Sequence, residues 1–90
     1  MAHTVREKTK LLARARRIRG QVEAIERALE AEVGCADVLQ VIASVRGAMN
    51  SLMAEVMEDH VRFHVINPAR DAERVRGAEE LIDVIRTYLK

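Results

Sequence analysis

The sequence predicts an all-α protein whose protomer is a long helical hairpin followed by a short C-terminal helix. Of its 90 residues, 49% are hydrophobic, yet only one is Phe, one is Tyr and none is Trp. Ala, Val, Leu, Ile and Met therefore supply the apolar content, alongside many Glu and Arg residues, which are good helix formers. The apolar residues also recur at steps of three and four, which is the period of an amphipathic helix.

The first predicted helix runs from about Val5 to Leu29. Its apolar residues repeat at steps of 4, 3, 4, 3 and 4, as in the seam of a coiled coil. They are Leu11, Ala15, Ile18, Val22, Ile25 and Leu29. Gly20 interrupts this helix at a cost of about 1 kcal/mol relative to Ala, which points to close backbone contact there. Val33 and Gly34 predict a short turn, in which Gly34 supplies backbone freedom.

The second predicted helix runs from about Ala36 to Val65. Its seam has the same steps and consists of Val38, Ile42, Val45, Met49, Leu52 and Val56. A helix of roughly 30 residues is near 45 Å long at about 1.5 Å per residue. One small protomer cannot cover such a rod, so we expect it to pack against a copy of itself. Asn67 and Pro68 end the helix, because proline cannot continue it.

The third predicted helix is short and runs from Asp71 or Arg76 to Tyr88, because Gly77 could delay its start. Its apolar face consists of Ala78, Leu81, Ile82, Ile85, Tyr88 and Leu89. The whole chain, residues 1–90, is predicted to be a single domain. A domain of this size buries only about 60% of its unfolded surface, so we expect it to form a homo-oligomer.

Several classes of protein are excluded by what the sequence lacks. No stretch of about 18 apolar residues is present, so no membrane span is expected. The first ten residues contain no apolar core of a signal peptide, and one cysteine excludes an internal disulfide. We therefore expect a cytoplasmic location.

The charges are distributed unevenly along the chain. Residues 1–20 contain seven basic residues and one acidic residue, a net charge of +6, whereas residues 21–90 contain eight basic and thirteen acidic residues, a net charge of −5. At about 100° per residue, the basic residues line both sides of the apolar seam. Charge alone allows two interpretations, contact with DNA phosphates or a solvated helix face, but this bias is stronger than solubility requires.

The single cysteine and the three histidines form a candidate metal site made of His3, Cys35, His60 and His64. His60 and His64 are four residues apart, so their imidazoles project from one helical face within chelating distance. Cys35 lies nearly 40 Å from His60 along a straight helix. If two long helices pair antiparallel, Cys35 of one protomer comes beside both histidines of the other. The alternatives are a buried structural thiol, a chance histidine pair and a His3 without function.

An enzyme is not expected. A cysteine and a histidine could form a nucleophile and its base, but no Gly-rich or oxyanion-type loop accompanies them. The acidic residues fall on helical surfaces, and no pair is marked out for acid–base catalysis.

Two stretches, residues 17–21 (Arg-Ile-Arg-Gly-Gln) and 45–48 (Val-Arg-Gly-Ala), resemble the CsoR/RcnR/FrmR family of small helical repressors. The resemblance extends over most of the chain. It implies antiparallel dimers that assemble into a disc-shaped tetramer. It also implies a repressor that grips operator DNA without its inducer and releases the DNA when the inducer binds. The DNA-contacting residues implied are Arg14, Arg17 and Arg46, with Lys8 and Lys10 as helpers.

His3, Cys35, His60 and His64 match the nickel/cobalt-responsive RcnR/DmeR branch of this family. The inducer implied is Ni(II) or Co(II), with Zn(II) as an alternative, and the genes controlled would encode metal efflux. Imidazoles with one thiolate suit these borderline ions, whereas Cu(I) prefers more sulfur. The chain departs from the branch at Phe63, where RcnR-like members can carry Glu, so a carboxylate ligand at that place is in doubt.

The alternative function is a formaldehyde-responsive repressor that uses Cys35 and the N-terminal amine. Relatives of that kind carry Pro at position 2 and usually an acidic residue at position 64. This chain has Ala2 and His64 at those positions, which favours the metal-responsive branch.

Overall fold

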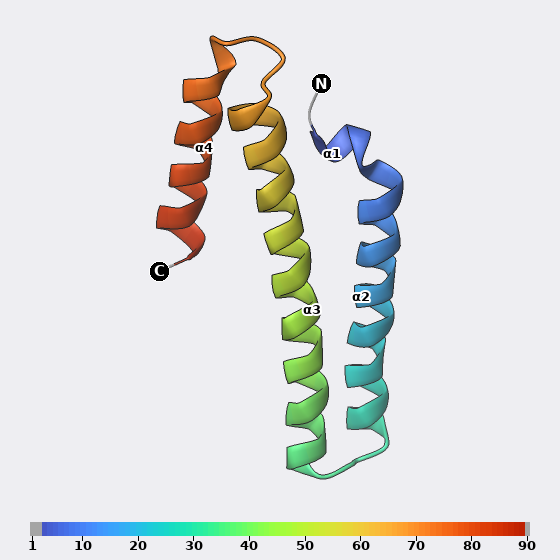
Figure 1. Cartoon of the computed structure of the whole chain (residues 1–90). Helices are drawn as coiled ribbons and strands as arrows, with labels where there is room; N and C mark the ends of the chain where they lie inside the picture. Colours follow the sequence, from blue (N-terminus) through green and yellow to red (C-terminus); the bar gives the residue numbers. More distant parts are fainter. Residues whose placement is uncertain (1–2, 90) are drawn as a thin grey trace. The chain divides into compact units, whose positions relative to one another are not determined.

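The computed structural model describes residues 3–89, with the backbone alone at His3 and Arg6, and the described residues contain helices but no strand. In chain order the elements are α1 (His3–Arg6), α2 (Lys8–Glu30), α3 (Cys35–Val61), the π-helical turn η1 (Arg62–Ile66) and α4 (Glu73–Tyr88) (Figure 1). The predicted all-α fold, with a long hairpin and a shorter C-terminal helix, is confirmed. None of the described helices is long and apolar enough to cross a membrane.

The chain divides into two compact units, which we call the histidine unit and the hairpin unit. The histidine unit consists of residues 1–7 and 54–90, and the hairpin unit consists of residues 8–53. Helix α3 runs through both, because the division falls after Met53. Helix α1, by contrast, belongs to the histidine unit, although it precedes the hairpin in sequence.

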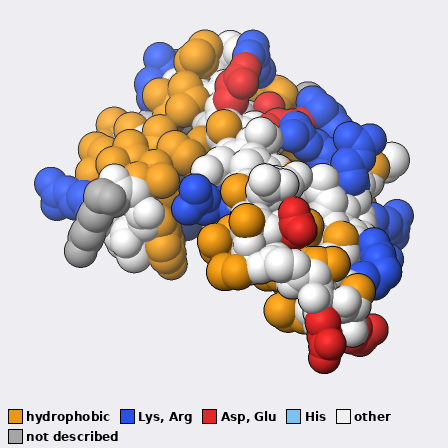
Figure 2. Space-filling model, turned by 90° about the horizontal axis from the view of Figure 1, so that it is seen from below, with side chains coloured by type: hydrophobic (Ala, Val, Ile, Leu, Met, Phe, Trp, Pro, Cys, Tyr) orange, Lys and Arg blue, Asp and Glu red, His pale blue; other side chains and the backbone are white. Residues whose placement is uncertain are grey.

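In the hairpin unit, α2 and the first part of α3 run antiparallel (Figure 1). Their core is small: Ile18 and Val45, each 8% exposed, are the buried apolar side chains of the described chain. Other positions of the predicted seam stay open, with Val22 at 42% and Leu29 at 59% exposure. Hydrophobic side chains are accordingly visible at the surface in Figure 2. The predicted period is correct, but one protomer covers little of the apolar stripe that this period creates.

Two details of the hairpin differ from the prediction. The first helix is interrupted at Glu7, which separates α1 from α2. The turn after α2 depends on Glu32 (φ 54°), and Gly34 has no positive φ. The N–H groups of Glu32 and Val33 donate to the carbonyls of Leu29 and Ala28 at 3.1 and 3.3 Å, which is a Schellman motif. The prediction that Gly34 supplies the backbone freedom is therefore wrong, because Glu32 adopts the left-handed conformation.

In the histidine unit, α3 ends at Val61 and the chain continues as η1. The predicted end of this helix at Asn67 is confirmed, but its last turn is π-helical, closed by a 2.9 Å bond from the Asn67 N–H to the Arg62 carbonyl. Helix α4 starts within the predicted interval and returns beside η1 (Figure 1).

Gly77 is the buried residue of α4 and allows this close packing. A Cβ atom at Gly77 would lie 2.5 Å from the backbone oxygen of His64 and 2.9 Å from its Cβ atom. No real side chain could occupy that position without moving backbone. Gly77 thus lies inside α4 and brings it against η1, rather than delaying the start of the helix.

Gly20 behaves differently. A Cβ atom there would meet nothing within 4 Å among the residues that the structure describes. The close backbone contact expected at Gly20 is therefore absent from the described chain. The outer face of α2 at this position is open to another molecule.

These two glycines predict opposite effects of the same substitution. Gly20→Ala should raise the free energy of unfolding by about 0.5–1 kcal/mol, because Ala is the better helix former and has room. Gly77→Ala should lower it by about 1–3 kcal/mol, because the added methyl group overlaps the His64 backbone. Urea unfolding followed by circular dichroism measures both. Equal effects of the two substitutions would contradict the packing of α4 on η1.

Candidate functional site

His60 and His64 come together in the histidine unit. His60 lies in the last turn of α3 and His64 lies in η1. Their ring centroids are 4.8 Å apart, the ring planes are inclined by 41°, and both side chains are half-buried. The adjacency predicted from their spacing is therefore present, although a π-helical turn rather than a regular α-helix presents the second ring.

The His60 ring is oriented by α4. Its Nε2 atom lies 2.8 Å from the backbone oxygen of Gly77 and 3.9 Å from Oε2 of Glu80. The Gly77 carbonyl can only accept a hydrogen bond, so Nε2 carries the proton and donates it. The lone pair of the neutral ring then lies on Nδ1, and a ring held in this way is typical of a metal-ligating histidine.

Glu80 is itself held in place. Its Oε1 atom accepts a 3.2 Å hydrogen bond from Nε of Arg76, one turn earlier on α4. Arg76, Glu80 and His60 therefore form a short polar chain. The sequence did not predict that Gly77 and Glu80 contact His60. The only local signal was their spacing of three residues, which places both on one face of α4.

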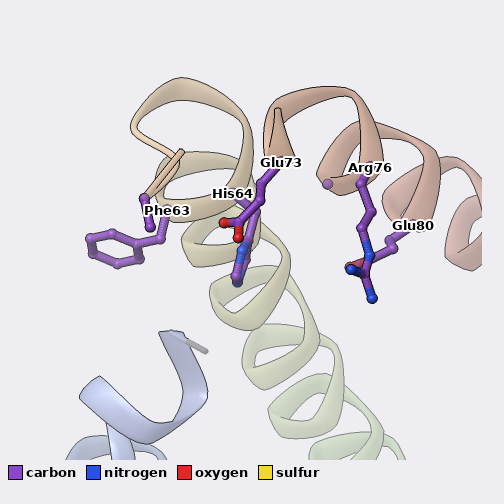
Figure 3. A pocket seen from close by; sticks show the side chains of 7 residues that line it. Phe63, His64, Glu73, Arg76 and Glu80 are labelled. Carbon is purple, nitrogen blue, oxygen red and sulfur yellow. The ribbon is translucent and has the colours of Figure 1, made fainter. Parts of the chain in front are cut away.

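A cavity of about 250 Å³ lies next to His64, between η1 and the start of α4. Its lining residues are Phe63, His64, Ala69, Glu73, Arg76, Gly77 and Glu80. Figure 3 shows Arg76 and Glu80 extending together from α4, with the Phe63 ring on the other side of His64. The carboxylates that line this cavity, Glu73 and Glu80, both come from α4, and position 63 is an aromatic residue.

Cys35 lies at the other end of α3, as its first residue, in the hairpin unit. It is a free thiol and is exposed. No group of three or more His, Cys, Asp or Glu side chains arranged to hold a metal occurs among the residues described here. One chain therefore presents the predicted ligands in two separate places, the thiol in one unit and the histidine pair in the other.

His3, the fourth predicted ligand, lies in α1, and its side chain is outside the described part of the structure. Ala2 and the N-terminal amine are likewise outside it. The α1 backbone belongs to the histidine unit. His3 is thereby in the same compact unit as His60 and His64.

All five predicted DNA-contacting residues fall in the hairpin unit. Four are on α2 and one is on α3: Lys8, Lys10, Arg14, Arg17 and Arg46. Arg14 is half-buried, and the other four are exposed. Arg17 and Arg46 each adjoin a core residue, Ile18 and Val45 respectively, so the hairpin core fixes the backbone at both. Basic side chains gather on the side of Figure 2 where α2 lies.

These features define a helical protein that presents a histidine pair in one unit and basic side chains in the other. A model of the metal-sensitive transcriptional repressor family matches residues 7–87. The chain belongs to this family, and it is a transcriptional repressor rather than an enzyme. Membership of the family implies that a metal ion and operator DNA are bound.

Three similar proteins illustrate the relationship. An uncharacterized protein encoded in the bioA 5′ region of Serratia marcescens is 55% identical over 93 residues, and the transcriptional repressor RcnR of Citrobacter koseri is 42% identical over 90 residues. Both alignments cover 100% of either chain. A variant of the formaldehyde-responsive regulator FrmR from Salmonella enterica serovar Typhimurium has a solved structure with a TM-score of 0.80 and 44% identity, covering 92% of this chain and 94% of that one. The resemblance to the CsoR/RcnR/FrmR family is confirmed.

The contact between Glu80 and His60 predicts that Glu80→Gln weakens Co(II) binding by about 10–100-fold, because His60 loses a charged partner that orients its ring. Competition with a chelator of known affinity measures the loss. Asp83→Asn, on α4 but outside the cavity lining, is the matched control and should bind Co(II) as the unaltered protein does. Unchanged affinity in Glu80→Gln would show that this carboxylate has no influence on the histidine.

Proposed function

We propose that this protein is a metal-responsive repressor that binds operator DNA without metal and releases it on binding Ni(II) or Co(II), which derepresses metal-efflux genes. One observation carries the proposal: the two imidazoles 4.8 Å apart, one of which is held by Gly77 with its lone pair on Nδ1. Two imidazoles with one thiolate are donors that suit borderline divalent ions, and Zn(II) is the alternative ion.

The proposed ligands are His3, Cys35, His60 and His64. Because Cys35 and the histidine pair lie at opposite ends of α3, a second copy of the chain has to complete the site. At about 100° per residue, Cys35 and His60 lie on the same stripe of α3, within about 20° of each other. Two α3 helices paired antiparallel would therefore place Cys35 beside His60 of the partner subunit.

The surface of α3 supports this pairing. In the hairpin unit, Leu39, Ile42 and Met49 are 59%, 42% and 51% exposed. Ile42 and Met49 belong to the stripe that carries Cys35. Apolar surface of this kind is stabilised when a partner covers it, at about 25 cal/mol for each Å² removed from water. Antiparallel dimers of this type are the units of the proposed homotetramer.

The basic residues of the hairpin unit are proposed to contact DNA phosphates. They are Lys8, Lys10, Arg14, Arg17 and Arg46. Gly20, on the open face of α2 among several arginines, leaves room for a close approach of the phosphate backbone. No helix-turn-helix pattern is visible in the sequence, so recognition would depend on phosphate contacts and DNA shape.

The interruption at Glu7 suggests how the two sites communicate. Helix α1 belongs to the histidine unit, and α2, with its basic residues, begins directly after the interruption. When His3 joins His60 and His64 as a ligand, α1 is held in the histidine unit and the start of α2 is restrained. Arg14 and Arg17 then leave the geometry in which they contact phosphates. By linkage, DNA must weaken metal binding by the same factor as metal weakens DNA binding.

Formaldehyde is the second candidate inducer. The 44% identity to a variant of the formaldehyde-responsive regulator FrmR and the exposure of Cys35 favour it. In this alternative, one carbon atom from formaldehyde bridges the Cys35 thiol and the N-terminal amine, and water is the product. His60 and His64 then have no ligand role.

The proposal predicts that one equivalent of Ni(II) or Co(II) weakens operator binding by about 5–150-fold, the usual range for coupled sites. Fluorescence anisotropy of labelled operator DNA at constant ionic strength measures this change. Undiminished affinity with saturating metal would refute the metal switch. Release by formaldehyde alone, with a bridged Cys35 found by mass spectrometry, would establish the second candidate instead.

Substitutions of the proposed DNA-contacting residues provide controls for that experiment. Arg17→Ala and Arg46→Ala should each lower the salt dependence of binding, because each leaves one phosphate without its cation. The slope of log K against log salt concentration should become shallower by about 0.9 for each such phosphate. Arg27→Ala, at the far end of α2, should leave the slope unchanged. An equal change of the slope in all three variants would mean that DNA binding depends on the total charge of the protein rather than on the proposed surface.

Mixing two defective variants tests whether the metal site lies between chains. Cys35→Ser and His60→Ala should each lose the thiolate-to-cobalt absorption band of the wild-type site. When equal amounts are unfolded and refolded together, roughly a quarter of the band should return, because half of the dimers contain one intact site out of two. A site formed within one chain would recover no band.

A further inference from the structure

We propose that Glu73, in the first turn of α4, is a specificity-determining residue that makes the metal site prefer divalent ions over Cu(I). Its carboxylate supplies a negative charge that stabilises a bound divalent ion and that Cu(I) does not require. The inference rests on the proposed function, because it takes His60 and His64 as ligands. Glu73 itself is not a ligand in this proposal and acts on the ion through its charge.

Glu73 lies opposite the proposed ligands, on the packed side of α4. Together with His64 it lines the cavity of about 250 Å³ next to η1. Figure 3 shows its side chain extending from the start of α4 toward His64. Gly77, one turn later on the same face of α4, packs against the backbone of His64. This packing holds the half-buried Glu73 carboxylate close to the histidine pair.

Glu73 differs from neighbouring glutamates because its side chain has no basic partner among the residues that the structure describes. Oε1 of Glu80 lies 3.2 Å from Nε of Arg76. Oε1 of Glu58 lies 3.0 Å from Nη2 of Arg62. The Glu73 side chain forms neither an ion pair nor a hydrogen bond within the described chain. Of the two carboxylates in the cavity, Glu73 is therefore the one whose charge no basic side chain balances.

Asp59 is a further acidic residue near the histidines. It precedes His60 on α3, and its Oδ2 atom is buried without a hydrogen-bond partner in the described part of the chain. At about 100° per residue, Asp59 projects from a different side of α3 than His60 does. It is also not among the residues that line the cavity. A substitution at Asp59 therefore has to be compared with one at Glu73.

The charge of the bound ion decides whether the Glu73 carboxylate contributes to affinity. A thiol loses its proton when it binds a metal, and imidazoles bind as neutral groups. A divalent ion with the Cys35 thiolate therefore leaves one positive charge at the site. Cu(I) with the same thiolate leaves no net charge. An unbalanced charge in a partly buried site is costly unless an opposite charge lies nearby, and Glu73 supplies one for the divalent ion alone.

The surroundings of the histidines strengthen this effect. Both imidazoles are half-buried, and the Phe63 ring lies on the other side of His64 (Figure 3). Charges interact more strongly beside apolar groups than in water, because the effective dielectric constant is lower there. The attraction between Glu73 and a charged metal site is therefore larger than between two groups in solvent.

The position of Glu73 also suits a structural role. An acidic residue in the first turn of a helix interacts favourably with the positive end of the helix dipole. Loss of that interaction would destabilise α4 whichever ion is bound, and would weaken both ions equally. The ratio of the affinities for Co(II) and Cu(I) therefore distinguishes an effect of charge on the ion from an effect on the helix.

Glu73→Gln tests the proposal in the full-length protein without DNA, because it removes the charge and keeps the length of the side chain. Competition with a chelator should show that Co(II) affinity falls about tenfold, as expected for the loss of one charge interaction in a partly exposed site. Cu(I) affinity, measured without oxygen against a Cu(I) chelator, should change by less than about twofold. Glu73→Asp keeps the charge and should retain most of the Co(II) affinity.

Two further variants are the controls. Glu79→Gln is the same substitution at an exposed position on the side of α4 opposite Gly77. It should leave the ratio of Co(II) to Cu(I) affinity at its wild-type value, and so should Asp59→Asn. Circular dichroism checks that each variant is folded. Glu73→Ser, which also lacks the charge and suits the start of a helix, replaces Glu73→Gln if the latter does not fold.

The proposal would be overturned by a wild-type affinity ratio in Glu73→Gln, or by an equal loss of preference in Asp59→Asn or Glu79→Gln. A wild type that binds Co(II) but shows either result would count against the role of Glu73 alone. A wild type that binds neither Co(II) nor Ni(II) would instead refute the metal site of the proposed function, and this inference with it.

Discussion

The contact between Gly77 and the backbone of His64 is the constraint on which the histidine unit depends. Since Gly77 has no Cβ atom, α4 packs directly against η1, and a methyl group there would lie 2.5 Å from the His64 oxygen. This proximity brings the Gly77 carbonyl within 2.8 Å of Nε2 of His60 and places Glu80 beside the same ring. A glycine inside a helix costs roughly 0.5–1 kcal/mol relative to alanine. Here that cost is offset by packing that orients the His60 ring.

The π-helical turn at Arg62–Ile66 belongs to the same arrangement. Turns of this kind are rare and occur frequently at functional sites. This one carries His64, and its backbone is the surface on which α4 packs. The histidine pair is therefore supported by three elements, α3, η1 and α4, rather than by one helix. Such support from neighbouring elements is what a site needs if it is to bind one class of ion reproducibly.

The hairpin unit shows the opposite property, because it leaves much of its apolar surface uncovered. Ile18 and Val45 are its buried side chains, whereas Leu39 and Met49 on α3 are more than half exposed. The lone thiol stands at the end of this surface, far along α3 from the histidines. A partner that covers the apolar surface would also supply the missing ligand. Self-association and metal binding would then depend on the same helix. The interruption of the helix at Glu7 would let the metal site act on the basic residues of α2.

The sequence by itself determined the class of fold, the limits of the two long helices and the short C-terminal helix to within a few residues, the adjacency of His60 and His64, and the concentration of basic charge on α2. These features follow from the helical period and from residues close together in the chain, so local patterns encode them. Only the tertiary structure decided that Gly77 serves packing, that His60 is protonated on Nε2, that Glu80 accompanies it and that Glu32 rather than Gly34 makes the turn. The histidine contacts join residues 17 and 20 positions apart, across a chain reversal, and no local pattern specifies such a meeting. The Glu32 turn is local in sequence. Its left-handed conformation is strained for a residue other than glycine, but several residue types can adopt it once the flanking helices are packed.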